Sequence, residues 1–191
     1  IRGRLLSIVQ GSMNDVLNTT NNISIEEMFS ASSVVELDDF AETNKTFVSG
    51  LLALKAYEYS RNSDYGNATK RLLVIEEAHN IVPNTEQKRV SSNIAMCSNH
   101  FTSMLAEVAA YGTGLVIIDQ RPTAVSPAVV ANTGIKIIHN LQAGEDKTAV
   151  GASLGLTETE VNMISDLKVG QAIVKIPDSP EKCRVNINRN L

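Results

Sequence analysis

The sequence has 191 residues, which suits one domain with a hydrophobic core, since single domains cluster at about 100–200 residues. Hydrophobic residues make up 43% and charged residues 20% of the chain, and the mean hydropathy is −0.04, which excludes a disordered or low-complexity protein. The net charge of −4 and the aromatic content of 4% argue against a broad basic surface and against base-stacking platforms for nucleic acid. No apolar run approaches the roughly 20 residues of a membrane span, and no signal peptide is recognisable, so a cytoplasmic protein without membrane contact is expected.

The two cysteines, Cys97 and Cys183, cannot build a disulfide framework and lack the CxxC spacing of zinc or redox sites. We therefore expect both to be buried as small apolar residues. The chain begins with Ile1 rather than Met, which suggests a piece of a longer protein.

Two parts are expected along the chain, a helical lead-in segment over 1–32 and a main domain over 33–191. The lead-in contains a weak helix over 1–17 and a short helix started by the capping box of Ser24 and Glu27. The main domain begins with a strand over 33–37 and a largely buried helix over 43–59. That helix has Phe47, Leu51 and Leu54 at helical spacing and Val48, Leu52 and Tyr59 on a neighbouring stripe. The later elements are expected as a strand over 72–75, a helix over 93–111 stopped at Gly112, a strand over 115–118, a short helix from Ser126, a strand over 135–139, helices over 145–154 and 158–167, and a closing strand pair over 171–176 and 183–187.

Short apolar strands separated by helices predict an α/β fold with a mostly parallel sheet covered on both faces. In such sheets, ligands bind beside the carboxyl ends of the strands, because the loops there converge on a crevice. The polar residues that directly follow each strand are therefore the candidate functional residues.

The first such place follows the strand over 72–75, where Glu76 and Glu77 stand in succession. Nucleotide hydrolases need this layout, because one acid orients Mg²⁺, usually through water, and the next polarises the attacking water. The alternative is that Glu76 and Glu77 are loop carboxylates, or acids stabilised by a helix N-terminus.

The second place follows the strand over 115–118, where Asp119 precedes Gln120, Arg121 and Pro122. A side-chain amide such as that of Gln120 can sense a γ-phosphate or position water, and a guanidinium such as that of Arg121 can neutralise phosphoryl charge. The alternative is a turn in which Pro122 ends the strand and Arg121 is solvated. One helix separates the two strands, so a right-handed crossover would make them parallel and near neighbours.

Other polar residues carry weaker signals. Asp38 and Asp39 follow the strand expected over 33–37 and are predicted mainly to cap the next helix, with a metal or subunit contact as the alternative. The three histidines show no metal spacing, and none is predicted to be a catalytic base; His79 is placed to bond the acidic strand end.

Three stretches, in this order and spacing, resemble the C-terminal half of the ATPase core of HerA-type DNA translocases, in the group of P-loop NTPases that includes FtsK and the VirB4 conjugation ATPases. They are Arg71 to Asn80 (RLLVIEEAHN), Gly112 to Pro127 (GTGLVIIDQRPTAVSP) and Ile135 to Asn140 (IKIIHN). The resemblance extends to Val34 to Asp39 and Glu145 to Ile187, so it spans nearly the whole chain from about Arg4. The EEAH sequence also occurs in other helicase classes, whereas its combination with the DQRP strand end and the SP helix is fairly specific.

By this resemblance Glu76 corresponds to the Walker B acid near Mg²⁺ and Glu77 to the catalytic glutamate. Gln120 matches the polar sensor of the nucleotide, and Arg121 stands beside it in a phosphate role. The resemblance implies a RecA-like P-loop NTPase core, mostly parallel sheet flanked by helices, with a C-terminal β-hairpin. It also implies a homo-oligomer, a hexamer, that hydrolyses ATP and moves double-stranded DNA through its pore with a nuclease or other effector partner.

Two departures from this pattern stand out. No G-x-x-x-x-G-K-[ST] sequence occurs, so the phosphate-cradling loop is absent, and we expect the N-terminal part of the core to lie upstream of Ile1. Basic residues that many relatives carry before Tyr111 are replaced by Val108, Ala109 and Ala110, so no arginine finger is assigned there. The chain alone is expected neither to bind ATP tightly nor to hydrolyse it. The alternative functions are a non-hydrolysing oligomerisation or effector-docking module, and a VirB4-like ATPase for protein or conjugative transfer.

Overall fold

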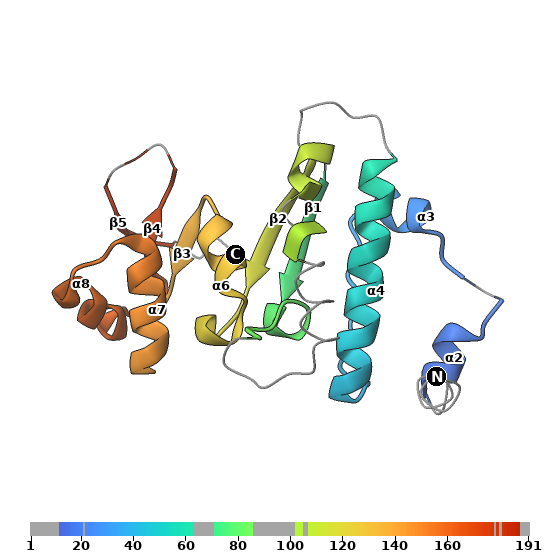
Figure 1. Ribbon diagram of the computed structural model, residues 1–191, viewed down its shortest axis with the longest axis horizontal. Coiled ribbons are helices and arrows are strands. Elements are labelled where there is room, and N and C mark those ends of the chain that lie inside the picture. The colour runs from blue at the N-terminus through green and yellow to red at the C-terminus, as the bar shows by residue number, and fades with distance from the viewer. Residues whose placement is uncertain are drawn as a thin grey trace. The chain divides into compact units, whose positions relative to one another are not determined.

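The computed structural model describes residues 12–20, 22–62, 71–85, 102–104, 107–177, 179 and 181–187. The chain divides into two compact units. One is formed by Ile1–Leu73 with Ser103–Leu115, and the other by Val74–Thr102 with Val116–Leu191. Figure 1 labels the elements of both.

Helices dominate the first unit. They are α2 (Ser12–Leu17), α3 (Ile25–Ser30), α4 (Glu42–Arg61) and the 3-10 turn η2 (Val108–Tyr111). Helix α3 starts as predicted, because the side chain of Ser24 accepts a hydrogen bond from the backbone N–H of Glu27. Of the helix predicted over 1–17, α2 confirms the last six residues, and residues 1–11 lie outside the described part of the chain.

The long helix α4 confirms the helix predicted over 43–59, and Val48 of the neighbouring stripe is buried, but the stripe of Phe47, Leu51 and Leu54 is not. Phe47 and Leu51 of the predicted apolar stripe are 40% and 37% exposed. The buried positions carry smaller side chains instead, namely Val48, Ala53, Ala56 and Ser60. Small side chains allow the helix backbone to approach its neighbours closely, and the Ser60 hydroxyl lies 2.8 Å from that of Thr113.

The strand predicted over 33–37 is not formed. This segment has no ladder partner among the described residues, and Val34 and Val35 are 87% and 47% exposed. β-branched residues favour extended backbone, but a strand also needs a neighbour that takes its hydrogen bonds. The predicted capping by Asp38 or Asp39 is also wrong, because the N-cap of α4 is Ala41, without a side-chain bond.

The strands β1 (Arg71–Glu76) and β2 (Thr113–Ile118) pair in a two-stranded sheet and run in the same direction (Figure 1). This confirms the two apolar strands and their parallel arrangement. Most of the helix predicted between them lies outside the described residues, and its end at η2 is stopped by Gly112 in the left-handed region (φ 74°), as predicted.

The two strands are not buried on both faces as predicted. Alternate side chains of each strand are exposed, because strand residues point in turn to opposite faces and the described chain covers one of them. The exposed residues are Leu72 (61%), Val74 (53%), Val116 (37%) and Ile118 (45%).

The second unit contains, after the ends of β1 and β2, every element predicted beyond Ser126. Its 3-10 turns are η1 (Ala78–Asn80), η3 (Pro122–Ala124) and η4 (Ile164–Asp166), its helices α6 (Pro127–Asn132), α7 (Gly144–Leu154) and α8 (Glu158–Met163), and its strands β3 (Lys136–Ile138), β4 (Gln171–Lys175) and β5 (Cys183–Asn186). A capping box of Thr157 and Glu160 starts α8, with both of its hydrogen bonds present.

β3, β4 and β5 form a separate antiparallel sheet. Ile137 lies opposite Val174, and Ile173 lies opposite Arg184 in the predicted C-terminal hairpin. The α/β class is thus confirmed, but β3 runs antiparallel to its neighbour, because the hairpin supplies its hydrogen-bond partner. Cys183 is exposed, which corrects its predicted burial, and Cys97 lies outside the described residues.

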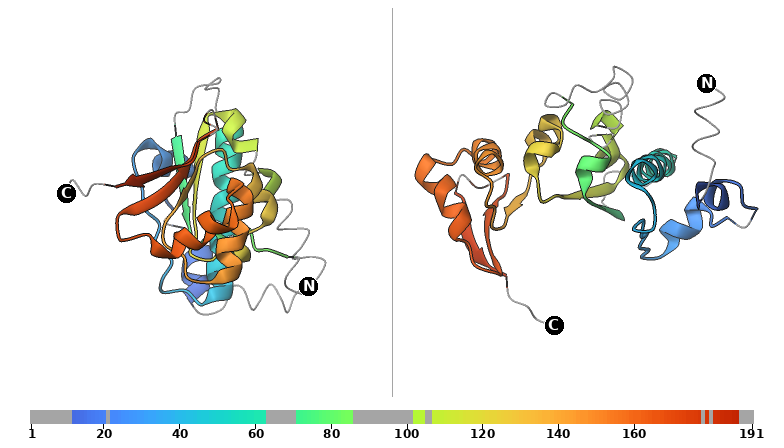
Figure 2. Two further views of the ribbon diagram at one scale, coloured as in Figure 1. Left: turned by 90° about the vertical axis from the view of Figure 1, so that its left-hand side faces the viewer. Right: turned by 90° about the horizontal axis from the view of Figure 1, so that it is seen from below.

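An apolar core joins α7 and the turn η4 to this sheet. Figure 2 shows the ribbon of this part of the chain from two further sides. Its buried members are Val150, Ile164, Leu167 and Ile173. Among the described residues, no helix has both the length and the apolar character required to span a membrane.

Candidate functional site

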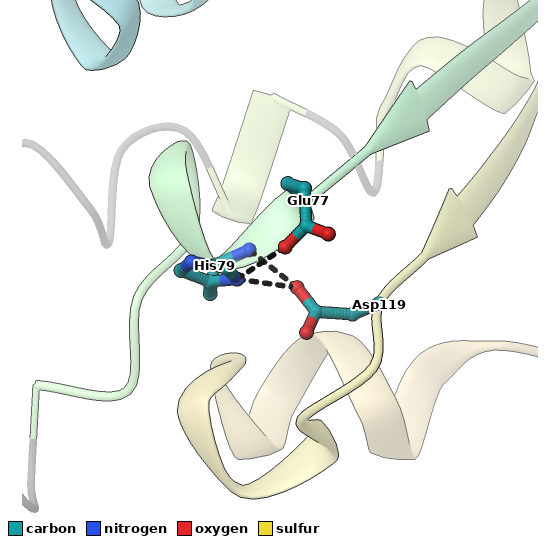
Figure 3. Close-up of side chains that lie close together, drawn as sticks. All are labelled: Glu77, His79 and Asp119. Atoms are coloured by element: carbon teal, nitrogen blue, oxygen red, sulfur yellow. Dashed lines mark hydrogen bonds and ion pairs between the residues drawn. The ribbon is translucent and has the colours of Figure 1, made fainter. Parts of the chain in front are cut away.

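Two loops of the second unit form the candidate site, and each follows one strand of the parallel pair. The loop after β1 carries Glu77 and His79, and the loop after β2 begins with Asp119 (Figure 3). Gln120 and Arg121 follow Asp119 in the second loop. Because both strands end at the same edge, residues some 40 positions apart in sequence come within hydrogen-bond distance.

Glu77 has an unusual backbone conformation. It lies in the left-handed region (φ 51°, ψ 50°), the one non-glycine residue with positive φ in the described part of the chain. This conformation costs about 1–2 kcal/mol for a residue with a Cβ, and such strain is concentrated at functional sites. The turn is closed by the N–H of Asn80, which donates to the carbonyl of Glu77 at 2.9 Å.

The carboxylate of Glu77 reaches both loops. Gln120 Nε2 donates to its Oε1 at 3.3 Å, and His79 Nδ1 lies 3.4 Å from its Oε2. The side chain is 43% exposed, so it remains accessible to water and to a ligand above the strand ends.

Asp119 is the acceptor at the centre of the cluster. Its Oδ2 accepts hydrogen bonds from the backbone N–H and from Nδ1 of His79, both at 2.9 Å, and its Oδ1 accepts the backbone N–H of Arg121 at 2.8 Å. The side chain is 6% exposed. Such a buried carboxylate fixes the loop after β1 and its own loop at the same time.

Arg121 completes the connection on the outer side of the cluster. Its Nη2 lies 3.3 Å from Nε2 of His79. The residue as a whole is exposed.

A second set of contacts holds the remainder of both loops. Asn84 donates its side-chain amide to the carbonyl of Thr123 at 2.9 Å, and Pro83 and Val125 form an isolated antiparallel bridge. The Oδ1 of Asp146, in the first turn of α7, accepts both the backbone N–H (3.0 Å) and the hydroxyl (2.7 Å) of Thr123. The loop that carries Gln120 and Arg121 is therefore anchored at both ends.

The structure brings together three of the four residues singled out in the sequence. Glu77 and Gln120 touch, and Arg121 joins them through His79. Glu76 ends β1 with an exposed side chain beside this cluster. Sequence reasoning assigned no role to Asp119 or Asp146, although Asp119 directly follows β2 as Glu77 directly follows β1.

Oxygen and nitrogen atoms that can bind a cation are both present at the site. Oxygens of Glu77 and Asp119 and a ring nitrogen of His79 lie within 4.8 Å of one another. Mg²⁺ favours oxygen ligands and retains several waters, so the exposed carboxylate of Glu76 suits a water-mediated contact better than the imidazole-containing set does. The placement of Mg²⁺ at Glu76 stays a prediction, resting on an exposed carboxylate at the end of β1.

No protein-family model matches the chain. Two curated proteins of Methanocaldococcus jannaschii are similar to it. A probable DNA double-strand break repair helicase HerA is 32% identical over 114 residues, which are 59% of this chain and 21% of that protein. A probable helicase, MJ1565, is 30% identical over 107 residues, 55% of this chain and 19% of that protein. The chain therefore spans about a fifth of the length of the curated relatives it matches.

Solved structures show the same fold. The crystal structure of B204, the DNA-packaging ATPase from Sulfolobus turreted icosahedral virus, has a TM-score of 0.58 and 18% identity, covering 94% of this chain and 78% of that one. The genome packaging NTPase B204 from Sulfolobus turreted icosahedral virus 2, in complex with ATP-gammaS, has a TM-score of 0.52 and 15% identity, covering 75% and 64%. The comparisons confirm the α/β fold, which the chain shares with these packaging ATPases, and its resemblance to the HerA-type ATPases.

Proposed function

We propose that this chain is part of the core of a DNA-translocating ATPase and supplies the water-activating side of its nucleotide site. The contact between Glu77 and Gln120 carries this proposal, because it joins the acid after β1 to the amide after β2. ATP hydrolysis requires such a pair, one group to polarise the attacking water and one to orient it or to sense the γ-phosphate. The sequence similarity to a probable HerA helicase and the structural likeness to DNA-packaging ATPases support the assignment.

The roles of the residues follow from their surroundings. Glu77 Oε2 and Oε1 are both near hydrogen-bond partners, and the partly exposed carboxylate accepts a proton from a water held in line with the γ-phosphate. Gln120 donates its Nε2 to Glu77, and its amide oxygen is the group that orients that water. The exposed Arg121 guanidinium neutralises charge on the phosphoryl oxygens. When bound, Mg²⁺ neutralises phosphate charge, and Glu76 would orient it through water.

The wider assembly belongs to the same proposal. A hexameric ring, duplex DNA in its pore, and a nuclease or other effector partner are the predictions that the resemblance adds. The division of the chain at residues 32 and 33 also remains a prediction. A motor for protein or conjugative transfer is the competing function, and DNA-stimulated ATP hydrolysis by the full-length protein separates the two, because a protein-export motor needs no duplex DNA.

The direct test is Glu77→Gln in the full-length protein. We expect ATP to bind with near-normal affinity while turnover falls about 10²–10⁴-fold, because the variant keeps the size of the side chain and loses its basicity. Glu158→Gln, an exposed acid at the start of α8, is the matched control and should hydrolyse ATP normally. Unchanged turnover in Glu77→Gln would overturn the proposal.

A further inference from the structure

The neutral form of His79 in the cluster is determined by its neighbours. A guanidinium has only donors, so the contact between Arg121 Nη2 and His79 Nε2, at 3.3 Å, requires Nε2 to be the acceptor. The proton of the neutral ring then resides on Nδ1, which lies 2.9 Å from Asp119 Oδ2 and donates to it. The ring orientation and the tautomer are therefore set by one buried carboxylate and one exposed cation.

Asp119 and Arg121, the two partners of His79, differ in their exposure to solvent. Asp119 is 6% exposed and also holds the backbone of both loops. Arg121 is exposed, so His79, with an 18% exposed side chain, is the group that limits where its guanidinium points. The imidazole also lies 3.4 Å from Glu77, and it thus stands between the acid of one loop and the cation of the other.

We propose that His79 and Asp119 are a positioning pair, in which Asp119 fixes the Nδ1–H tautomer of His79 and His79 holds Arg121 beside Glu77 in the orientation that meets the phosphoryl group. This inference rests on the proposed ATPase function and adds two residues to its site. Neither residue touches the nucleotide in this scheme; both act through Arg121. A positioned cation stabilises a transition state more than a mobile one, because no reorganisation is needed when charge develops.

A double-mutant cycle between His79 and Arg121 tests the scheme in the full-length protein. His79→Ala is expected to lower kcat about 10–100-fold, the usual loss when a supporting residue of a site is removed, and to leave KM for ATP within about twofold. In the Arg121→Ala background, the same change should lower kcat no further, because the group through which His79 acts is gone. Losses that multiply in the double variant would overturn the proposal.

Two further variants separate positioning from general stability. His79→Gln retains a donor and an acceptor on one side chain and should recover part of the lost kcat. His139→Ala is the matched control, since it removes another imidazole of the second unit, whose Nδ1 bonds the carbonyl of Gln171 at 3.1 Å, and it should leave kcat unchanged. If His79→Gln were as slow as His79→Ala, or His139→Ala lost as much kcat as His79→Ala, the effect would be structural and the proposal wrong.

Nitrogen-15 NMR of the histidine rings tests the same arrangement without enzyme activity. The resonances that disappear in His79→Gln identify His79, and we expect them to report the Nδ1–H tautomer in the wild type. Asp119→Asn should abolish this preference, because one of its two terminal atoms becomes an N–H donor that faces another donor. A predominant Nε2–H tautomer in the wild type would overturn the proposal.

The outcomes distinguish this inference from the proposed function. Normal turnover in Glu77→Gln would remove the ATPase assignment, whatever the tautomer of His79. Loss of turnover in Glu77→Gln together with multiplicative losses for His79 and Arg121 would retain the ATPase assignment and reject the positioning pair.

Discussion

In the C-terminal lobe, formed by α7, α8, η4 and the β3–β5 sheet, Leu154 and Ile164 are 0% exposed, and Ile164 packs among other apolar side chains. In the strand-end loops, residues 77–85 and 119–126, the groups that fix the structure are instead the carboxylates of Asp119 and Asp146. Apolar packing is non-directional and tolerates small shifts, whereas each carboxylate oxygen bonds specific donors. The lobe therefore provides stability, and the loops provide the defined geometry that a catalytic site requires.

The largest loss of stability is expected from the apolar core of the lobe. Ile164→Ala should lower the free energy of unfolding by about 2–5 kcal/mol, measured by urea denaturation, because it leaves a cavity beside Val150 and Ile173. Met163→Ala is the control, because Met163 precedes Ile164 in sequence and is 50% exposed. This substitution should change the free energy of unfolding by less than about 0.5 kcal/mol. Equal losses in the two variants would mean that this core does not hold the lobe.

Loss of the polar contact between Asp146 of the lobe and Thr123 of the loop is expected to destabilise the fold less than loss of the apolar core. Asp146→Ala removes the acceptor of the Thr123 N–H and hydroxyl, and hydrogen bonds to a charged group contribute about 1.5–3 kcal/mol. Asp146→Asn should retain most of that stability, because one oxygen, Oδ1, accepts both bonds and an amide oxygen can replace it. If the asparagine variant were as unstable as the alanine variant, the charge rather than the bonding geometry would be responsible.

The same contrast explains what the sequence predicts. The lobe elements were predictable because apolar spacing, the capping box of Thr157 and Glu160, and the turn residues are all local signals. The candidate site was predictable only at the level of strand ends, since Glu77 and Gln120 follow apolar runs.

The remaining features depend on contacts between residues far apart in sequence. Asp119 becomes an anchor only when the loop after β1 brings the donors of His79 to it. The buried side of α4 was predicted only in part for a similar reason, because Ser60 is buried beside Thr113, 53 residues later, while the larger Phe47 is 40% exposed. The segment over 33–37 has the composition of a strand but no partner strand among the described residues. The sequence of one segment does not show whether another strand will pair with it.

Tighter packing between α7 and α8 is expected to change the stability of the fold by a smaller amount. A Cβ at Gly151 would collide with the side chain of Val161, so Gly151→Ala should lower the free energy of unfolding by about 1–3 kcal/mol. The double variant with Val161→Ala should recover part of this loss by making room. Gly144→Ala, where an added Cβ meets no atom within 4 Å, is the matched control and should not destabilise the lobe. If Gly151→Ala left the free energy of unfolding unchanged, α7 and α8 would have moved apart to accept the added methyl group at little cost.

The smallest effect on stability is expected at the start of α8, where the lobe has a polar contact, the capping box of Thr157 and Glu160, in addition to its apolar core. The pKa of Glu160 is lowered from its ordinary value of 4.5, first because the backbone N–H and then because the hydroxyl of Thr157 bond its carboxylate, with a further contribution from Lys182. A carboxyl group with a lowered pKa in the folded state stabilises the fold above its unfolded pKa, and this contribution disappears as the pH falls through the folded pKa.

The difference in unfolding free energy between wild type and Glu160→Gln should therefore be present at pH 7 and shrink from about pH 5 to about pH 3. Chemical denaturation at several pH values measures it. Glu158→Gln removes a charge from the same turn without breaking the bonds to Thr157, and it is the control. An equal pH dependence in both variants would assign the effect to the charge at the helix start. A dependence confined to Glu160 would instead show that the lobe, too, contains a carboxylate whose directed hydrogen bonds matter.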